Sequence, residues 1–375
     1  MAPVHRGVQA LVGWIDSHNG KAGVTLRPPA AAAHLAALED MLLSPLPSDL
    51  RLMLGRHDGG RLPNGVLLSA SPSAGTDSIL ETRADLAKRM GRRPDDGELP
   101  LPFYRSDEGA VLVFDRSAGP VPDTWPIADY HLETRETRLV HRTLDGFCSY
   151  CVADWTDSDF NAPFSLDKYL KAGLRHAKME PDVSAAHATA AHALRRAGRP
   201  KDALASYLRA ARCLPALAYA DWEALKLAVL LGDVPAALEA ASRVSARAPR
   251  ARWRSRETTP LRVAQALGWL AQEKEHRELM LRLLDQLAAQ ADPGDVAAIH
   301  AVRKAMFTES PMPETRATRA TAVPAHDNPL KRWAALEEAY REGRLRDEDL
   351  LLDPAYGGRD ADPPLHRLLS IRREF

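Results

Sequence analysis

The feature that most constrains this chain is a register of 34 residues that repeats in its C-terminal half. When residues 191–215 are placed above residues 225–249, the same residue types recur in step. The matching pairs are Gly198 and Gly232, Ala203 and Ala237, Leu204 and Leu238, and Pro215 and Pro249. Glycine relaxes a turn between helices, alanine lets two helices approach closely, and proline stops a helix. The register therefore predicts helical hairpins, which need further helices on both ends to bury their faces.

The repeat resembles the tetratricopeptide repeat, whose period is 34 residues. The positions of that motif fall in the first copy on Gly198, Ala203, Tyr207, Ala210 and Pro215. The second copy keeps Gly232, Ala237 and Pro249, but it has Ala241 at the aromatic position and Val244 at the second small position. Residues 261–292 form a third, degenerate unit that is expected to cap the stack. The alternative is a generic helical domain with accidental periodicity.

The N-terminal half has a different pattern of apolar residues, which predicts short strands mixed with helices. Helical spacing covers residues 30–43, 49–54 and 77–89, and strand-like runs cover 65–69, 103–104, 110–114, 124–127 and 138–141. The Asp107-Glu108-Gly109 step between two of these runs is typical of a hairpin turn. Because strands and helices do not alternate regularly, we predict an α+β fold with an antiparallel or mixed sheet.

Composition and periodicity together predict five segments. They are an N-terminal helix that packs on the first domain (1–26), an α+β domain (27–170), an all-α domain of helical hairpins (171–308), a proline-rich linker (309–329) and a helical tail (330–375). The tail contains two groups of leucines, which we expect to dock back on the repeats.

Several short motifs follow one another in the α+β segment. They are Pro28-Pro29, Ala33–Glu39 with a Leu-Glu pair on a helix, Leu46-Pro47-Ser48-Asp49-Leu50, Arg56 to Gly60, Gly75 to Ile79, Leu101-Pro102-Phe103, Gly109 to Asp115, and Gly119-Pro120-Val121. The same residues also have folding roles. Ser48 or Asp49 can cap a helix, while Asp58-Gly59-Gly60 supplies positive-φ positions for a tight turn into a strand.

This order of motifs resembles the SUKH superfamily, which includes a fungal cell-wall-synthesis regulator and bacterial immunity proteins of polymorphic toxin systems. The resemblance spans about 40% of the chain. It implies a mixed sheet with helices, and a protein that masks the active site of a toxin without chemistry of its own. The family's asparagine-glycine pair appears here as Asp58-Gly59, and its serine-phenylalanine helix is a poor match at Thr143–Phe147, with Phe164-Ser165-Leu166 as a displaced alternative.

We find no motif that predicts catalytic residues, a cofactor site or a complete metal site. Cys148 and Cys151 have the spacing of a metal knuckle or a redox pair, but a structural zinc site needs four ligands and the chain has no second cysteine pair. The paired carboxylates lie in polar turns, where a general acid would remain solvated. Five arginines between Arg247 and Arg256 flank Trp253, and they could contact phosphate or line a solvated loop.

The charge distribution suggests where a partner could bind. The chain has 50 basic and 50 acidic residues, which argues against binding nucleic acid or a membrane surface through net charge. Residues 27–170 hold 22 acidic and 15 basic residues, a difference of −7, whereas residues 174–304 hold 14 and 21, a difference of +7. The candidate partner-binding residues are Asp95, Asp96, Glu98, Asp107 and Glu108.

These observations predict a cytoplasmic, non-enzymatic protein whose partner is another protein. The first hypothesis is an immunity or antitoxin-type protein that sequesters a toxin domain, and an acidic surface suits a basic nuclease-type toxin. The alternative is a regulatory scaffold that binds client proteins through its helical repeats. Three sparse cysteines predict a reducing compartment, and we identify no secretory signal and no run of about 20 apolar residues that could cross a bilayer. The sequence leaves the oligomeric state open.

Overall fold

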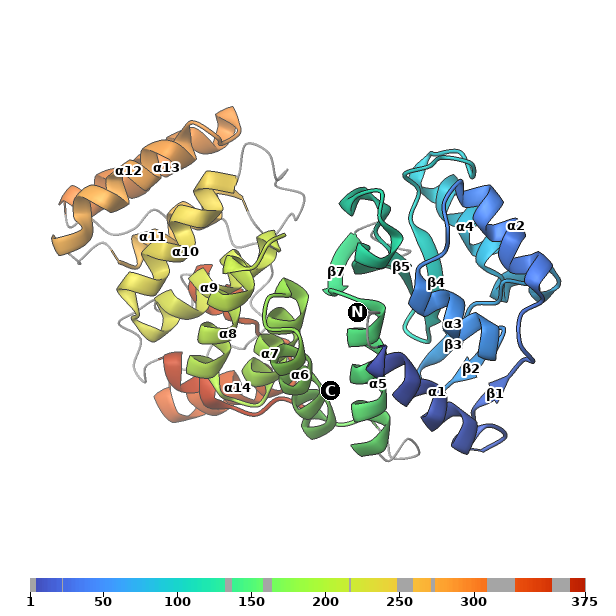
Figure 1. The fold of residues 1–375 in the computed structure, drawn as a ribbon. Coiled ribbons are helices and arrows are strands. Elements are labelled where there is room, and N and C mark those ends of the chain that lie inside the picture. Colours follow the sequence, from blue (N-terminus) through green and yellow to red (C-terminus); the bar gives the residue numbers. More distant parts are fainter. Residues whose placement is uncertain are drawn as a thin grey trace. The chain divides into compact units, whose positions relative to one another are not determined.

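The computed structural model describes residues 5–21, 23–131, 137–157, 164–215, 217–247, 259–270, 274–308, 328–352 and 365–374. The chain forms two compact units. Unit 1 comprises Met1–Phe164 and Arg175–Ala186, and unit 2 comprises Ser165–Leu174 and His187–Phe375. Each unit has its own hydrophobic core. As predicted, the fold is α+β: the N-terminal half contains a sheet, and the residues after it in the chain form helices (Figure 1).

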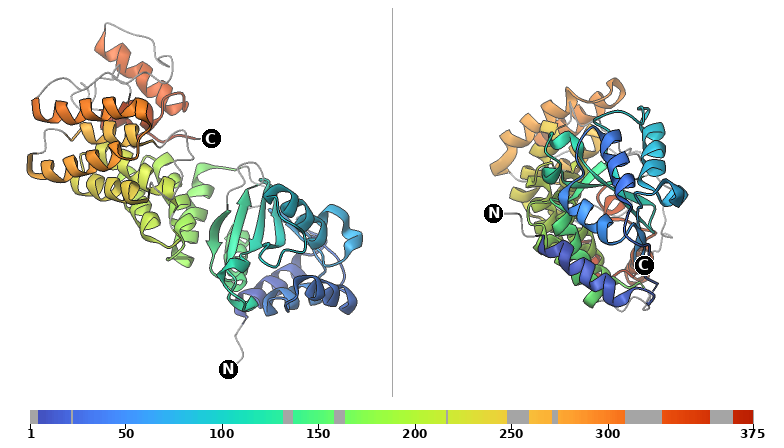
Figure 2. Two further views of the ribbon diagram at one scale, coloured as in Figure 1. Left: turned by 90° about the horizontal axis from the view of Figure 1, so that it is seen from above. Right: turned by 45° about the vertical axis from the view of Figure 1, so that its right-hand side comes forward.

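The sheet of unit 1 has seven strands that pair in chain order, each antiparallel to the next. The strands are β1 (Thr25–Leu26), β2 (Gly60–Leu62), β3 (Gly65–Leu67), β4 (Leu101–Ser106), β5 (Ala110–Phe114), β6 (Ile127–His131) and β7 (Thr137–His141). Figure 2 shows the sheet with its flanking helices. We predicted an antiparallel or mixed sheet, and every pairing in the described sheet is antiparallel. The strand expected at 124–127 was misplaced: Pro122–Thr124 form a 3₁₀ turn, and β6 begins only at Ile127.

Helices pack on both faces of this sheet. They are α1 (Arg6–His18), α2 (Ala32–Leu42), α3 (Ser48–Arg56), α4 (Ile79–Met90) and α5 (Leu144–Asp157). Side chains alternate across the sheet, so Phe103 and Phe114 join the main core, while Val111 and Val113 join a smaller one beside Leu86 of α4. The main core lies under α1, α3 and α5, and the burial of their apolar stripes fixes these helices on the sheet.

The turn into β2 has the conformation that its glycines predicted. Gly59 and Gly60 adopt φ angles of 76° and 134°. A Cβ atom on Gly59 would lie 2.6 Å from the carbonyl oxygen of Leu67, so the position excludes any side chain. Asp58 is buried beside the turn, and its carboxylate accepts a hydrogen bond of 2.6 Å from the backbone N–H of Ala70. This motif therefore joins β2 to the segment after β3.

Helix α5 is the main element of unit 1 that sequence reasoning missed. Its apolar residues recur at 3–4 spacing, and the buried ones are Leu144, Phe147, Cys148, Cys151 and Trp155. Thr143 caps the helix by accepting a hydrogen bond of 3.0 Å from the N–H of Gly146. The spacing of these apolar residues indicates a helix, but the dipeptide Asp145-Gly146 is typical of a turn.

The last residues of α6 (Leu166–Met179) are fastened to the edge strand β7 within unit 1. The imidazole of His176 lies 2.9 Å from the carbonyl oxygen of Val140. Just beyond the helix, the buried Glu180 carboxylate lies 3.0 Å from Nδ1 of His141. These contacts cover polar atoms at the end of the sheet that would otherwise be left without partners.

Unit 2 is helical throughout its described residues. Its helices are α7 (Ser184–Arg196), α8 (Pro200–Arg212), α9 (Ala218–Leu231), α10 (Val234–Arg247), α11 (Pro260–Gly268), α12 (Arg277–Ala288), α13 (Pro293–Thr308), α14 (Pro329–Arg341) and α15 (Asp347–Leu352), together with a 3₁₀ helix at Leu365–Ser370. The first residues of α7 belong to unit 1. Helix α9 packs against both α8 and α10, and α11 packs against α12 and α13.

The repeated register corresponds to repeated structure. Gly198 and Gly232 each follow a helix of the register, with nearly equal φ angles of 71° and 72°. Ala203 and Ala237 are both fully buried, as expected for positions of close helix approach. The register thus corresponds to two equivalent helix–turn–helix units, α7–α8 and α9–α10.

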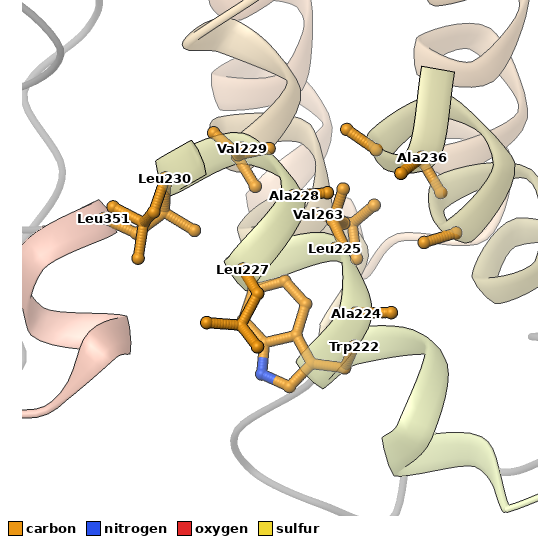
Figure 3. Close-up of a cluster of buried hydrophobic side chains, with 14 of the residues drawn as sticks. Trp222, Ala224, Leu225, Leu227, Ala228, Val229, Leu230, Ala236, Val263 and Leu351 are labelled. Atoms are coloured by element: carbon orange, nitrogen blue, oxygen red, sulfur yellow. The ribbon is translucent and has the colours of Figure 1, made fainter. Parts of the chain in front are cut away.

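The C-terminal tail docks on unit 2, as its leucines predicted. Leu350, Leu351, Leu368 and Leu369 are buried in the same core as the repeats. Figure 3 shows Leu351 of α15 against Leu230 of α9. The expected linker at 309–329 lies outside the described residues, apart from Asn328, which caps α14, and Pro329, which begins it. Among the helices described above, none is long and apolar enough to cross a membrane.

Candidate functional site

The five candidate acidic residues lie in two turns of unit 1, at opposite ends of β4. Asp95, Asp96 and Glu98 precede the strand, whereas Asp107 and Glu108 form the turn between β4 and β5. Since β4 has six residues, the two turns are about 20 Å apart. We call residues 95–98 and 107–108 the acidic turns. The structure therefore presents two separate acidic sites instead of one continuous patch.

Arginines of unit 1 neutralise part of this charge. Asp107 makes two hydrogen bonds of 2.7 Å with the guanidinium of Arg61. In the other turn, Asp95 pairs with Arg93, and Asp96 pairs with Arg92. Glu98 has 81% of its side chain exposed, although one oxygen lies 3.7 Å from Arg92. Glu98 and Glu108 are thus exposed carboxylates that a partner can reach.

A buried arginine forms hydrogen bonds with the backbone of the first acidic turn. Arg83 of α4 donates hydrogen bonds to the carbonyl oxygens of Pro94 (3.2 Å) and Asp96 (2.7 Å). Burial lowers the pKa of Arg83 to about 10, so its guanidinium remains charged at neutral pH. A charged donor makes a stronger hydrogen bond than a neutral one, and the loop is therefore fixed before any partner arrives.

The Cys148–Cys151 pair faces the core of unit 1. Both thiols are buried on α5, and the Sγ of Cys148 lies 3.8 Å from the sulfur of Met53. Burial raises the pKa of both thiols well above the usual range, which disfavours the thiolate needed for metal binding or redox chemistry. Within the described ranges, no three histidine, cysteine or acidic side chains are grouped as metal ligands would be.

These thiols predict a loss of stability at alkaline pH. In the unfolded chain a thiol ionises above about pH 8.5, whereas in the folded unit it stays protonated, so the folded state binds more protons and the free energy of unfolding falls as pH rises. For two such thiols we expect a loss of about 2–3 kcal/mol between pH 7.5 and pH 9.5. Urea unfolding at the two pH values measures it.

The matched control is the double variant Cys148→Ala/Cys151→Ala, which lacks both titrating groups. Its free energy of unfolding should change much less over the same pH range. A wild-type protein whose stability is the same at both pH values would contradict the assignment, as would rapid labelling of Cys148 or Cys151 by iodoacetamide in the folded state.

The arginine run that flanks Trp253 lies outside the described residues, apart from the backbone of Arg247. A different set of cations comes together in unit 2. Arg195 of α7 and Arg262 of α11 form ion pairs with carboxylates of α15, and Lys226 is a buried cation of α9, which also contacts α15. We call these three residues the basic face. They lie on α7, α9 and α11, which are the first helices of three successive hairpins. The stacking of the hairpins therefore brings them to one side of unit 2.

The first residue of α15 is the centre of this arrangement. The carboxylate of Asp347 accepts hydrogen bonds of 2.6 and 2.7 Å from the guanidinium of Arg195, and a third of 2.5 Å from the hydroxyl of Tyr340. Both partners of the ion pair are buried. Burial alone would raise the pKa of Asp347, but Arg195, Arg373 and Lys226 together hold it below the usual value.

The neighbouring carboxylate and the apolar residues complete the contact. Glu348 forms an ion pair with Arg262. The indole N–H of Trp269 donates a 2.7 Å hydrogen bond to the carbonyl oxygen of Leu351, close to the end of α15. Burial alone would lower the pKa of Lys226, yet the adjacent Glu223 and the carboxylates of α15 keep it raised. The basic face therefore holds a short acidic helix with an apolar end.

Sequence reasoning did not find the basic face. The signal available was the excess of basic residues in 174–304, beside the run Asp347-Glu348-Asp349 in the tail. Neither feature specifies which cation meets which carboxylate, because the partners are separated by 86 to 152 residues along the chain.

No protein-family model and no curated protein sequence matches this chain.

Proposed function

We propose that this chain is a non-enzymatic protein-binding protein of the immunity or antitoxin type, which sequesters a basic toxin domain at the acidic turns of unit 1. The observation that carries the proposal is the preorganisation of exposed carboxylates. Glu98 and Glu108 stand on turns at the two ends of one sheet strand, and Arg83 fixes the first turn from within. Carboxylates that are already in place bind a cationic surface at a smaller entropic cost.

We further propose that unit 1 is SUKH-like and that the hairpins of unit 2 are tetratricopeptide-like. The order of short motifs from Pro28 to Val121, on a sheet flanked by helices, supports the first assignment. The 34-residue register, with its matched glycine conformations, supports the second. In this arrangement unit 1 provides the surface for the toxin, and unit 2 provides a further docking surface.

Co-expression with a basic toxin domain encoded beside this gene tests the proposal. We expect the wild-type chain to restore growth and the double variant Glu98→Lys/Glu108→Lys to fail, because like charges would then face the toxin. Asp85→Lys is the matched control, since this half-exposed carboxylate lies on α4 outside the acidic turns. Equal rescue by all three proteins, or no binding to any such toxin, would contradict the proposal.

A regulatory scaffold is the second candidate, and the basic face of unit 2 favours it. A client protein would then bind through the repeats, and unit 1 would serve regulation. In pull-downs with the full chain, a client retained by Glu98→Lys/Glu108→Lys but lost on changing Arg262 to Ala would support this alternative over the first.

A further inference from the structure

We propose that the basic face of unit 2 is a binding site for a short acidic helix of a partner protein, and that α15 is the chain's own occupant of that site. The partner is defined by the chemistry of α15: a run of three acidic residues, Asp347-Glu348-Asp349, followed by leucines at 350–352. This inference concerns unit 2 and does not depend on what the acidic turns of unit 1 bind.

The first argument is that α15 has the properties of a bound peptide. It has only six residues, and a helix of that length is not stable in water without contacts to another surface. Four of its residues are buried against the other helices of unit 2: Asp347, Glu348, Leu350 and Leu351. It contacts α9 and α11, the helices that carry Lys226 and Arg262 of the basic face. A short amphipathic helix laid across a helical surface is a common form of peptide recognition.

The second argument concerns why the contact is ionic. A buried ion pair is often no more stabilising than an apolar pair of the same size, because both charges must leave water. Its main benefit is selectivity, since an uncharged segment would leave the buried cations without partners. Arg195 and Arg262 with their two carboxylates therefore select an acidic segment over the many apolar helices that could fill the same space.

The third argument is that α15 does not satisfy the whole surface. The ammonium group of Lys226 hydrogen-bonds to Glu223 of its own helix at 2.7 Å, although it is buried beside α15. A partner segment that places one more carboxylate within reach of Lys226 would thus bind more tightly than α15 does.

The contacts of α15 also predict how such a partner would compete. Because α15 belongs to the same chain, its local concentration at the basic face is on the order of millimolar. A partner segment with equal intrinsic affinity would bind the wild-type chain weakly, and it would bind much better once α15 is weakened. Helix α15 then acts as an intramolecular competitor for the basic face.

The test uses the full-length chain and a fluorescein-labelled synthetic peptide with the sequence of residues 343–353. The double variant Asp347→Asn/Glu348→Gln removes both charges of α15 with little change in shape. Fluorescence anisotropy should show that the variant binds the peptide at least ~10-fold more tightly than the wild type does. A peptide with asparagine and glutamine at the same two positions should lose about 10-fold in affinity for the variant.

Hydrogen exchange on the wild-type chain keeps the proposal testable if the variant does not fold. Excess acidic peptide should increase deuterium uptake in 345–352, where α15 is displaced, and should leave α13 unchanged. The proposal is overturned if exchange in 345–352 does not respond to the peptide. It is also overturned if wild type and a folded variant bind equally, or if the uncharged peptide binds as well as the acidic one. None of these results would affect the proposal for the acidic turns.

Discussion

Replacing Arg195 by methionine should lower the free energy of unfolding of unit 2 by about 3–5 kcal/mol. Methionine fills much of the same volume but cannot donate the two hydrogen bonds to Asp347 or the 2.7 Å hydrogen bond to the carbonyl oxygen of Leu369. The carboxylate of Asp347 would then be buried with the Tyr340 hydroxyl as its remaining hydrogen-bond donor among the contacts described above. Urea unfolding, with hydrogen exchange to localise the change, measures the effect.

A matched pair of variants separates charge burial from loss of packing. Arg195→Met/Asp347→Leu should recover most of the lost stability, because neither charge is then left alone in the core. Arg199→Ala removes an exposed ion pair with Asp202 and should cost less than about 1 kcal/mol. If the Arg195 variant were as stable as the Arg199 variant, the buried pair would not hold the tail on unit 2.

Replacing Phe103 by alanine should destabilise unit 1 by about 3–5 kcal/mol. Phe103 is fully buried in β4, with its ring centroid 4.9 Å from that of Phe114 and 5.5 Å from that of Phe147 on α5. The substitution removes one of the aromatic contacts between the sheet and α5 and leaves a cavity. Thermal unfolding followed by near-ultraviolet circular dichroism measures the loss.

The control for this variant is Leu52→Ala on α3, whose side chain is 43% exposed. It should change stability by less than about 1 kcal/mol, because little apolar area returns to water. We expect only the Phe103 variant to increase hydrogen exchange in α5 as well as in β4. Equal losses for the two variants would mean that the Phe103 site relaxes and fills its cavity.

Much of the fold could be predicted from local sequence, and the successes have a common cause. The glycines of Asp58-Gly59-Gly60 and Gly109 marked positions that need positive φ angles, and these glycines adopt them. Apolar spacing located α2, α3 and α4 to within a few residues. Turn geometry and one-sided burial are properties of a few neighbouring residues, so a sequence window of ten or so residues contains the information.

The failures occurred where local signals conflicted. Residues 144–155 have helical spacing, but Asp145-Gly146 resembles a turn, and the burial of α5 against the sheet decides the outcome. At 124–127 the proline at Pro126 delays the strand, which begins at Ile127. In both places the final structure depends on the surface that the segment meets.

The sequence by itself determined the repeat, the turns and the presence of an apolar tail, because helix periodicity and glycine conformation act over short distances. Only the tertiary structure decided which charges pair. Asp107 forms an ion pair with Arg61, and Asp347 forms one with Arg195, although these partners are 46 and 152 residues apart along the chain. Ion pairing requires contact within a few ångströms and gains its selectivity from burial, and both conditions are set by how the helices and strands stack.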